Sequence, residues 1–166
     1  MTPGGLGEEM HTTSVGGGEF RVTLDKDEVL LAKGLDAGIG VAIFDPVARV
    51  GGLLHFQLPE SRTNPNQARS QPALFADTGV PLLLHKAIES GAQKERMIVR
   101  VAGGAQGGPE PGAQRIAKGN YLAMRKIFWK TGVLVQEEDV GGTAQRTLAL
   151  EIGTGCMVIH HVAEPA

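Results

Sequence analysis

Short apolar runs recur along most of the chain and are separated by glycine, proline and aspartate. Runs of this length, rich in Val, Ile and Leu and bounded by turn-forming residues, are typical of β-strands. Glycines on both sides of Thr154 separate the last two runs and predict a hairpin turn there. The predicted strands are residues 20–24, 29–33, 40–45, 50–56, 96–102, 133–138, 146–152 and 156–161.

Two longer segments place apolar residues three and four positions apart, which is the period of an amphipathic helix. The first is predicted to begin with Asp77 or Thr78 as its N-cap, so that Pro81 falls in the first turn, and to end at Gly91. The second is predicted to open at Asn120 and to end after a basic last turn. The apolar stripes are Val80, Leu83, Leu84, Ala87 and Ile88 in the first helix and Tyr121, Met124, Ile127 and Phe128 in the second.

The remaining segments complete the expected organisation. Residues 1–18 are small, polar and rich in glycine, which predicts a flexible N-terminal tail ahead of one domain over residues 19–166. Residues 60–73 are predicted to form a long polar loop. Because strands outnumber helices and do not alternate strictly with them, we expect an α+β fold in which mixed or antiparallel sheets pack against two main helices.

Composition narrows the functional classes. The 166 residues contain 42% hydrophobic and 20% charged residues and have a net charge of −2, so neither nucleic acid nor an anionic membrane is an expected partner. No apolar run approaches the roughly 20 residues that span a bilayer. The first 18 residues lack the basic start and apolar centre of a signal peptide, and Cys156 is the single cysteine. We therefore expect a cytoplasmic protein without membrane insertion or an internal disulfide.

The strongest chemical signal is His55, which ends an apolar run and precedes a loop that begins at Pro59. This is a usual position for a general base, and a general base acts on a nucleophile or on water. The segment that should supply a nucleophile, residues 34–45, contains no Cys, Ser or Thr. The pattern indicates the scaffold of an enzyme without its nucleophile.

Five short blocks, in unbroken order over about residues 28–160, resemble one known family. They are Gly34-Leu35 with Val41 and Asp45-Pro46; Gly51-Gly52 with His55 and Leu58-Pro59; Ala76-Asp77-Thr78; Ala102-Gly103-Gly104-Ala105; and Asp139-Val140-Gly141-Gly142 with Arg146, Ile152 and Thr154-Gly155. On these blocks the chain resembles the CheD chemotaxis proteins, which are chemoreceptor glutamine deamidases.

The resemblance implies a specific chemistry. Such proteins hydrolyse the side-chain amide of receptor glutamines to glutamate, using a Cys–His pair assisted by a threonine and no cofactor. His55 falls on the family's histidine, Gly38 falls on its cysteine and Ala32 on its threonine. Ala37 falls on the family's serine, and the neighbouring Asp36 and Gly40 also depart from the pattern, as natural loss of the activity would produce. The family's Ile-Gly-x-Arg-Asn element is altered in residues 116–120.

Each candidate residue has an alternative interpretation. His55 can be a retained general base, a residue used only for binding, or a hydrogen-bonded structural histidine. Cys156 lies in a predicted hairpin turn and is expected to be a structural or exposed thiol rather than a relocated nucleophile. A hydroxyl from Ser61 or Thr63 could approach His55 but would form a weak triad without an orienting acid. The other candidates, a metal site at His160-His161 and a phosphate loop at residues 103–108, are disfavoured by alternation on a strand and by the missing Gly-Lys-Ser/Thr.

Two functions remain. The first is a CheD-like protein that is catalytically inactive and binds or regulates chemotaxis partners, either chemoreceptor cytoplasmic helices or a CheC-type phosphatase. The second is an active protein-glutamine deamidase with an unrecognised nucleophile. For both we expect Gly38 and His55 to meet at one end of a sheet. The first further predicts a shallow apolar recess between Ala32, Gly38 and His55, bordered by residues 60–73.

Overall fold

The computed structural model describes residues 9–162, and these residues form two β-sheets and a layer of helices. The strands are β1 (His11–Ser14), β2 (Glu19–Thr23), β3 (Glu28–Leu35), β4 (Ile39–Asp45), β5 (Val50–Phe56), β6 (Ile98–Gly103), β7 (Glu137–Val140), β8 (Arg146–Glu151) and β9 (Met157–His161). The strand order is β1-β3-β8-β9 in the four-stranded sheet and β2-β5-β4-β6-β7 in the five-stranded sheet. All neighbouring pairs are antiparallel except β1–β3 and β6–β7.

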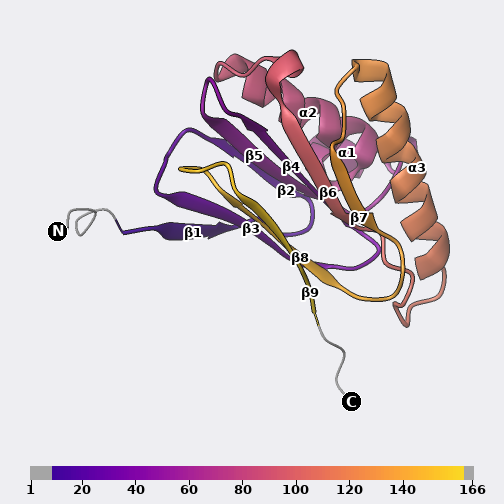
Figure 1. Cartoon of the computed structure of the whole chain (residues 1–166). Coiled ribbons are helices and arrows are strands. Elements are labelled where there is room, and N and C mark those ends of the chain that lie inside the picture. Colours follow the sequence, from indigo (N-terminus) through magenta and orange to yellow (C-terminus); the bar gives the residue numbers. More distant parts are fainter. Residues whose placement is uncertain (1–8, 163–166) are drawn as a thin grey trace.

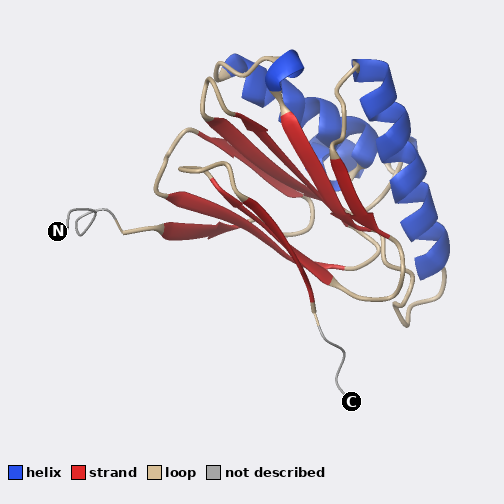
Figure 2. Cartoon of the chain, viewed as in Figure 1, coloured by secondary structure: helices blue, strands red, loops and turns tan. Residues whose placement is uncertain are grey.

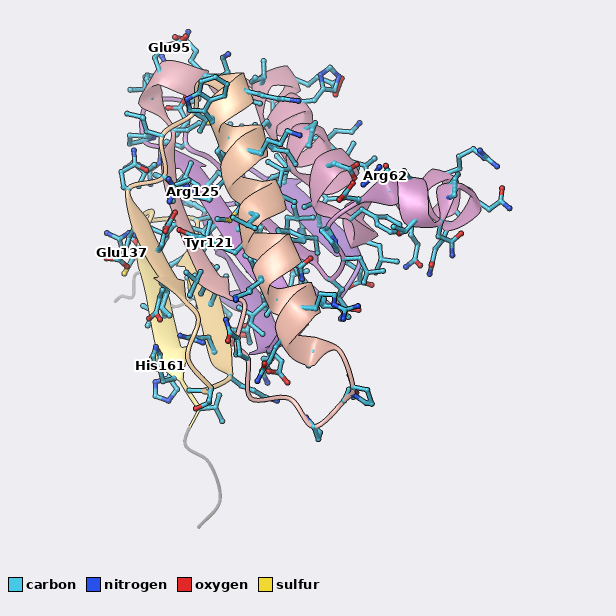
Figure 3. The ribbon with its side chains drawn as sticks, turned by 90° about the vertical axis from the view of Figure 1, so that its right-hand side faces the viewer. Arg62, Glu95, Tyr121, Arg125, Glu137 and His161 are labelled. Atoms are coloured by element: carbon cyan, nitrogen blue, oxygen red, sulfur yellow. The ribbon has the colours of Figure 1, made fainter. Side chains whose placement is uncertain are left out.

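Three α-helices and three single-turn helices complete the described chain. The α-helices are α1 (Pro65–Ser70), α2 (Ala76–Glu89) and α3 (Ala113–Thr131), and the 3₁₀ turns are η2 (Ser61–Thr63), η3 (Pro72–Leu74) and η4 (Lys94–Arg96). Figure 1 shows the helices on one face of the five-stranded sheet and the four-stranded sheet against the other face. Figure 2 shows the same three layers by secondary structure, and Figure 3 looks onto α3, which lies on the outside. The predicted α+β fold with mixed sheets and two main helices is confirmed.

The layers enclose two hydrophobic cores. One core lies between the five-stranded sheet and α2 and α3, and the other lies between the two sheets. Successive residues of β4 alternate between them, because neighbouring side chains of a strand point to opposite faces. Ile43 packs on the helix side and Phe44 on the side of the other sheet. Strands β4 and β5 are therefore buried on both faces, which explains why they are apolar at nearly every position.

The N-terminal segment differs from the prediction. Residues 11–14 form β1, which pairs in parallel with β3, and Val15 is only 3% exposed in the core between the sheets. The fold thus includes the second half of the expected tail, while residues 1–8 lie outside the described part of the chain. Polar residues in β1 concealed it, because a short edge strand that buries little carries almost no apolar pattern.

The segment after β5 was also predicted incorrectly. Instead of a long loop, residues 60–73 form η2, α1 and the start of η3. The side chain of Asn64 caps α1 by accepting a hydrogen bond from the amide of Gln67, and Pro65 is at the first helical position. This helix buries no residue, so it shows no amphipathic period in the sequence.

The helix and strand boundaries shift most at three places. Helix α2 begins at Ala76, so Pro81 lies inside the helix, and Asp77 accepts hydrogen bonds from Ser61 instead of serving as N-cap. Helix α3 begins at Ala113, well before the predicted start at Asn120. The earlier start leaves no sign in the sequence, because Gly112, which precedes the helix in a left-handed conformation, has no polar capping side chain. The strand expected at 133–138 is β7, which begins only at Glu137.

Candidate functional site

His55 lies near the end of β5 and is 4% exposed. Its side chain shares a strand face with Leu53, which belongs to the core between the two sheets. Burial lowers the pKa of His55 below its usual value, and the nearby Val15 backbone and the charge of Glu19 oppose this shift only partly. The imidazole is consequently neutral at physiological pH and has a nitrogen that can accept a proton or a hydrogen bond.

Gly38 immediately precedes β4 and lies next to His55. A Cβ atom placed on Gly38 would lie 3.3 Å from Nε2 of His55 and 2.8 Å from the carbonyl oxygen of Phe56. Strands β4 and β5 are antiparallel neighbours, with Gly40 opposite His55, so the hairpin itself brings the two residues to one end of the sheet. The structure therefore has the proximity that the sequence predicted, and position 38 offers no side chain to the histidine.

Backbone hydrogen bonds fix the turn that contains Gly38. The carbonyl of Gly38 accepts from the amide of Gly104 at 3.0 Å, and the carbonyl of Asp36 accepts from the amide of Ala105 at 2.7 Å. Gly103 crosses so close to the turn that a Cβ there would lie 2.2 Å from the Gly38 oxygen. With φ at 126°, Gly103 also has a conformation that other residues rarely adopt. The Gly103-Gly104-Ala105 block thus fixes the position of the turn at Gly38, which is a different role from that of a phosphate-binding loop.

Asn120 holds the other side of the same turn from the middle of α3. Its side-chain amide donates to the carbonyl of Ala37 at 2.9 Å and to that of Gln57 at 3.0 Å, and the residue is completely buried. One side chain thereby ties the turn before β4 to the segment that follows His55. Asn120 is a positioning residue, which the sequence had assigned to a helix start.

A cavity of about 520 Å³ opens beside Gly38 and His55. Its other lining residues come from the end of β3 and the turn before β4, the segment after β5, α1, the loop between β6 and α3, the start of α3 and the loop before β8. They are Gly34, Asp36, Ala37, Gln57, Leu58, Gln67, Leu74, Gly108, Glu110, Pro111, Ala113, Ile116 and Gln145. The lining contains no Ser, Thr, Cys, Lys or Tyr, and its titratable groups besides His55 are two carboxyls.

Comparison with known proteins identifies the family. A family model described as CheD chemotactic sensory transduction matches residues 57–161. A probable chemoreceptor glutamine deamidase CheD 1 of Syntrophus aciditrophicus is 43% identical over 147 residues, which cover 89% of this chain and 92% of the relative. The chain belongs to the CheD family. A probable chemoreceptor glutamine deamidase CheD of Solibacter usitatus is 44% identical over 146 residues, which cover 88% of this chain and 86% of the relative. A probable chemoreceptor glutamine deamidase CheD 2 of Anaeromyxobacter dehalogenans is 41% identical over 150 residues, which cover 90% of this chain and 94% of the relative.

The C-terminal CheD block has a structural role at the edges of the two sheets. Arg146 is 4% exposed and donates to the carbonyls of Gly141 and Ala144 and to the carboxylate of Asp139. His161 binds the same carboxylate at 2.8 Å. Asp139 lies on β7 and its partners on β8 and β9, so the cluster links the edges of the two sheets. His160 and His161 therefore do not act together, as expected for adjacent strand residues.

Ala32 does not line the cavity. It is completely buried on β3, opposite Leu148 of β8, in the core between the sheets. The recess expected between Ala32, Gly38 and His55 is therefore bounded by Gly38 and His55 but not by Ala32, and only Gln67 of residues 60–73 reaches it. It is also more polar than expected, because carboxyl and amide side chains form much of its wall.

The hydroxyl candidates are occupied elsewhere. Ser61 Oγ lies 3.0 Å from the carboxylate of Asp77, and Thr63 Oγ1 donates to the carbonyl of Glu60 at 2.8 Å. Neither residue lines the cavity beside His55. The structure does not bring a Ser–His pair together at this site.

Cys156 is exposed and lies at the opposite end of the sandwich. Its turn packs beside Phe44, at the far end of β4 from Gly38, because a Cβ on Gly155 would lie 2.5 Å from the Phe44 ring. Arg49 in the β4–β5 turn donates to the carbonyl of Gly153. The seven residues of β4 span about 20 Å, which separates Cys156 from His55.

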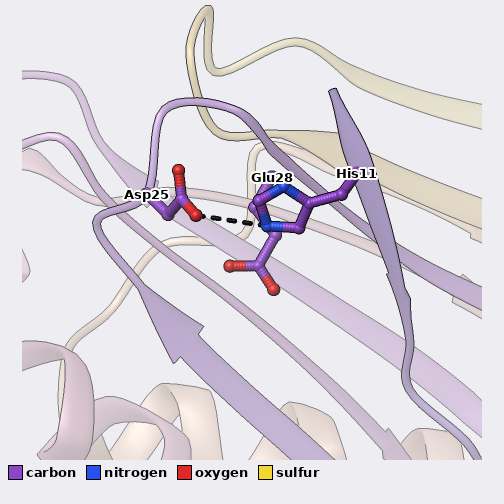
Figure 4. Close-up of side chains that lie close together, drawn as sticks. All are labelled: His11, Asp25 and Glu28. Carbon is purple, nitrogen blue, oxygen red and sulfur yellow. Dashed lines mark ion pairs between the residues drawn. The ribbon is translucent and has the colours of Figure 1, made fainter. Parts of the chain in front are cut away.

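His11, Asp25 and Glu28 form the one group among the described residues whose side chains converge as metal ligands could. Figure 4 shows His11 paired with Asp25, at 3.1 Å, above the Glu28 carboxylate. Glu28 already accepts hydrogen bonds from Arg21 and Thr13, which lower the pKa of its carboxyl to about 2 against the opposing effect of burial. An adjacent guanidinium repels a cation, so the cluster fits an ion-pair network better than a metal centre.

The centre of the site, Gly38 and His55, could be predicted from the sequence, whereas its periphery could not. The pocket residues Asp36, Glu110 and Gln145 come from loops that carry no periodic signal. The signal that could have identified Asn120 was its place in the altered Ile-Gly-x-Arg-Asn element, since an Asn that persists within a helix requires a hydrogen-bonding reason.

No helix among the described residues is long and apolar enough to cross a membrane.

Proposed function

We propose that this CheD-family chain acts as a binding or regulatory protein in chemotaxis and does not hydrolyse receptor glutamines. The observation that carries the proposal is the empty position facing His55. The Nε2 atom of His55 lies beside Gly38, and no lining residue of the cavity has a hydroxyl, thiol or amine. Attack on an unactivated amide needs a strong nucleophile, and removing a nucleophile that works with its base can lower the rate by about 10⁶.

The partners we propose are chemoreceptor cytoplasmic helices and a CheC-type phosphatase. Two relatives are named as probable chemoreceptor glutamine deamidases, and this supports the receptor as a partner. A scaffold that once admitted a receptor glutamine side chain would retain a cavity that fits it, such as the cavity beside His55. Gln57, Gln67 and Gln145 in the cavity wall offer amide groups that pair with a partner's amide or carboxylate. Shape and hydrogen bonding then give affinity without chemistry.

The decisive experiment measures catalysis and binding on the same protein. Purified chain is incubated with a receptor cytoplasmic fragment, and released ammonia is measured beside the association of the two proteins. We expect binding and no ammonia above background. His55→Glu, which introduces a charge into the buried site, should weaken binding, whereas Glu95→Gln, an exposed change in η4, should not. Ammonia release that depends on His55 contradicts the proposal, as does a failure of the parent chain to bind either partner.

A second candidate is an active deamidase in which His55 activates water directly. Asp36 and Glu110 line the cavity together with the neutral imidazole, so acid and base groups are both present. In that reaction water adds to the amide carbon, the carbon–nitrogen bond breaks, and ammonia leaves with the proton that the histidine returns. The same ammonia assay decides between the two candidates, because only this one predicts a rate that Asp36→Asn or Glu110→Gln reduces.

A further inference from the structure

The outer face of α3 differs in charge from the rest of the molecule. The helix contains no Asp or Glu, although acidic residues outnumber basic ones in the chain, 18 to 16. Its exposed basic residues are Arg115, Lys118, Arg125, Lys126 and Lys130. Among the described residues, ion pairs are seen for Arg125, with Glu138 at 3.7 Å, but not for Lys126 or Lys130. These two charges are available to a partner.

The same face carries the two most exposed large apolar side chains of the described chain, Trp129 and Leu134, together with Leu122. Trp129 is 84% exposed, Leu134 just beyond the helix is 76% exposed, and Leu122 is 65% exposed. Leu122, Lys126 and Trp129 are four and three residues apart, so they form one stripe along the helix. An exposed tryptophan between lysines is typical of a protein interface, where its ring and a polar rim are both used.

The surface is hollowed on both sides of this stripe. A cleft of about 530 Å³ is lined by Lys126, Trp129 and Leu134 and, in β7, by Glu138, whose carboxylate is paired with Arg125. A second cleft, of about 600 Å³, is lined by Leu122, Lys126 and Lys130 and extends to the segment after β5 and the start of α2. Its two carboxylates also have partners within the chain, Glu60 with Arg62 and Asp77 with Ser61. Figure 3 shows the length of α3 facing outward, with Tyr121 and Arg125 along it. A helix of 19 residues is about 28 Å long, which matches the footprint of a partner helix.

We propose that the face of α3 formed by Leu122, Lys126, Trp129, Lys130 and Leu134 docks an acidic amphipathic helix of a partner protein. Charge complementarity selects the occupant: Lys126 and Lys130 attract carboxylates, while Trp129 and the leucines accept the partner's apolar stripe. Grooves beside a ridge suit a helix better than a flat bilayer. This proposal goes beyond the proposed function, because the face lies outside the cavity at His55.

The chain carries its own reporter for this surface, because Trp129 is its only tryptophan. The probe is a synthetic amphipathic helical peptide with Leu on one face and Glu on the other. Its control has Lys at every Glu position. Adding the acidic peptide should shift the emission of Trp129 to shorter wavelength and reduce its quenching by acrylamide. Raising the salt concentration should weaken binding, because exposed charges are screened within about 10 Å at 0.1 M salt.

Variants separate this face from other surfaces, with binding followed by the anisotropy of a labelled peptide. Lys126→Glu with Lys130→Glu should weaken binding at least about tenfold, and Trp129→Ala should weaken it comparably. The matched pair Lys33→Glu with Arg69→Glu, exposed elsewhere, should change it less than about twofold. The face lies outside the cavity at His55, so failure of peptide binding here is distinguishable from failure of the proposed function, which the ammonia and receptor-binding assays test.

Three outcomes overturn the proposal. Equal binding of the acidic and basic peptides would show that apolar contact alone attracts the probe. An unchanged Trp129 spectrum with the acidic peptide, together with a shift on vesicles containing anionic lipid, would assign the face to a membrane surface. Concentration-dependent dimerisation that Trp129→Ala abolishes, without peptide binding, would assign it to a second copy of this chain.

Discussion

Restoring the family's reactive side chains should not restore deamidation. In the variant Gly38→Cys with Ala32→Thr, the new Cβ at position 38 would lie 2.8 Å from the carbonyl oxygen of Phe56, which belongs to the sheet backbone. No Cβ atom tolerates that contact, so either the turn or the end of β5 must move. The turn is held by Gly104, Ala105 and Asn120, and its movement breaks hydrogen bonds.

The magnitude follows from packing. Forcing an extra group into a close-packed site costs about 1–3 kcal/mol, and Ala32→Thr adds volume and a hydroxyl to a completely buried position. We expect the double variant to unfold at a urea concentration about 1 M lower than the parent. A thiol displaced by about 1 Å from productive geometry loses on the order of 10² in rate, so ammonia release should stay close to that of the parent.

The assay compares three proteins by urea unfolding, ammonia release from a receptor fragment, and the alkylation rate of the introduced thiol. Gly108→Cys is the matched control, since its Cβ would meet Asp36 and Ala113 at an ordinary 3.4 Å in the same cavity. The control should keep the stability of the parent, and Cys156 is replaced by Ser in all three proteins. A double variant that is as stable as the parent and releases ammonia in a His55-dependent way would refute the reasoning.

Three further predictions concern polar contacts elsewhere in the fold. Burial alone would raise the pKa of Asp45, but the ion pair with Arg96 and the hydrogen bonds from backbone amides outweigh this effect and lower the pKa from 3.8 to about 2. The carboxylate therefore adds about 2 kcal/mol of stability, which is complete well above pH 4 and declines as the pH falls towards 2. The difference in stability between the parent and Asp45→Asn should accordingly narrow between pH 7 and pH 3 in urea titrations. Asn120→Ala should lower the unfolding free energy by about 2–4 kcal/mol, because the carbonyls of Ala37 and Gln57 lose their donor, and hydrogen exchange should show a loosened turn at Gly38. His161→Ala, which removes one exposed contact to Asp139, should cost no more than about 1 kcal/mol in the same titrations.

The strands that could be predicted from the sequence are those buried on both faces. Residues 50–56 were predicted at the bounds that β5 has, since a strand covered on two sides is apolar throughout and is flanked by turn residues. β1 and α1 could not be predicted, because an element that buries little leaves no apolar period. The first turns of α3 were missed for a related reason: Ala113 and Ala117 fill the buried positions with small side chains.

The same distinction applies to the site. Gly38 and His55 could be placed together because the chemistry implied by the family resemblance requires their proximity, and the β4–β5 hairpin has the register that provides it. The pairing of Asn120 with Ala37 and Gln57 spans 83 and 63 residues, and tertiary packing alone creates it. The expected position of Ala32 beside the cavity failed because a sequence does not state on which side of a sheet sandwich a small residue lies.

A scaffold can lose its reactive side chains without losing its shape when the backbone holds the site. Every contact found to position the turn at Gly38 uses a main-chain carbonyl, and its donors are the amides of Gly104 and Ala105 and the side chain of Asn120. None of them requires a particular side chain at position 38. Selection on binding alone would therefore preserve Asn120 and the Gly103-Gly104-Ala105 block without preserving a reactive side chain at position 38. In the proposed binding protein, the residues that matter most are those that build the cavity and those on α3, rather than His55 as a base.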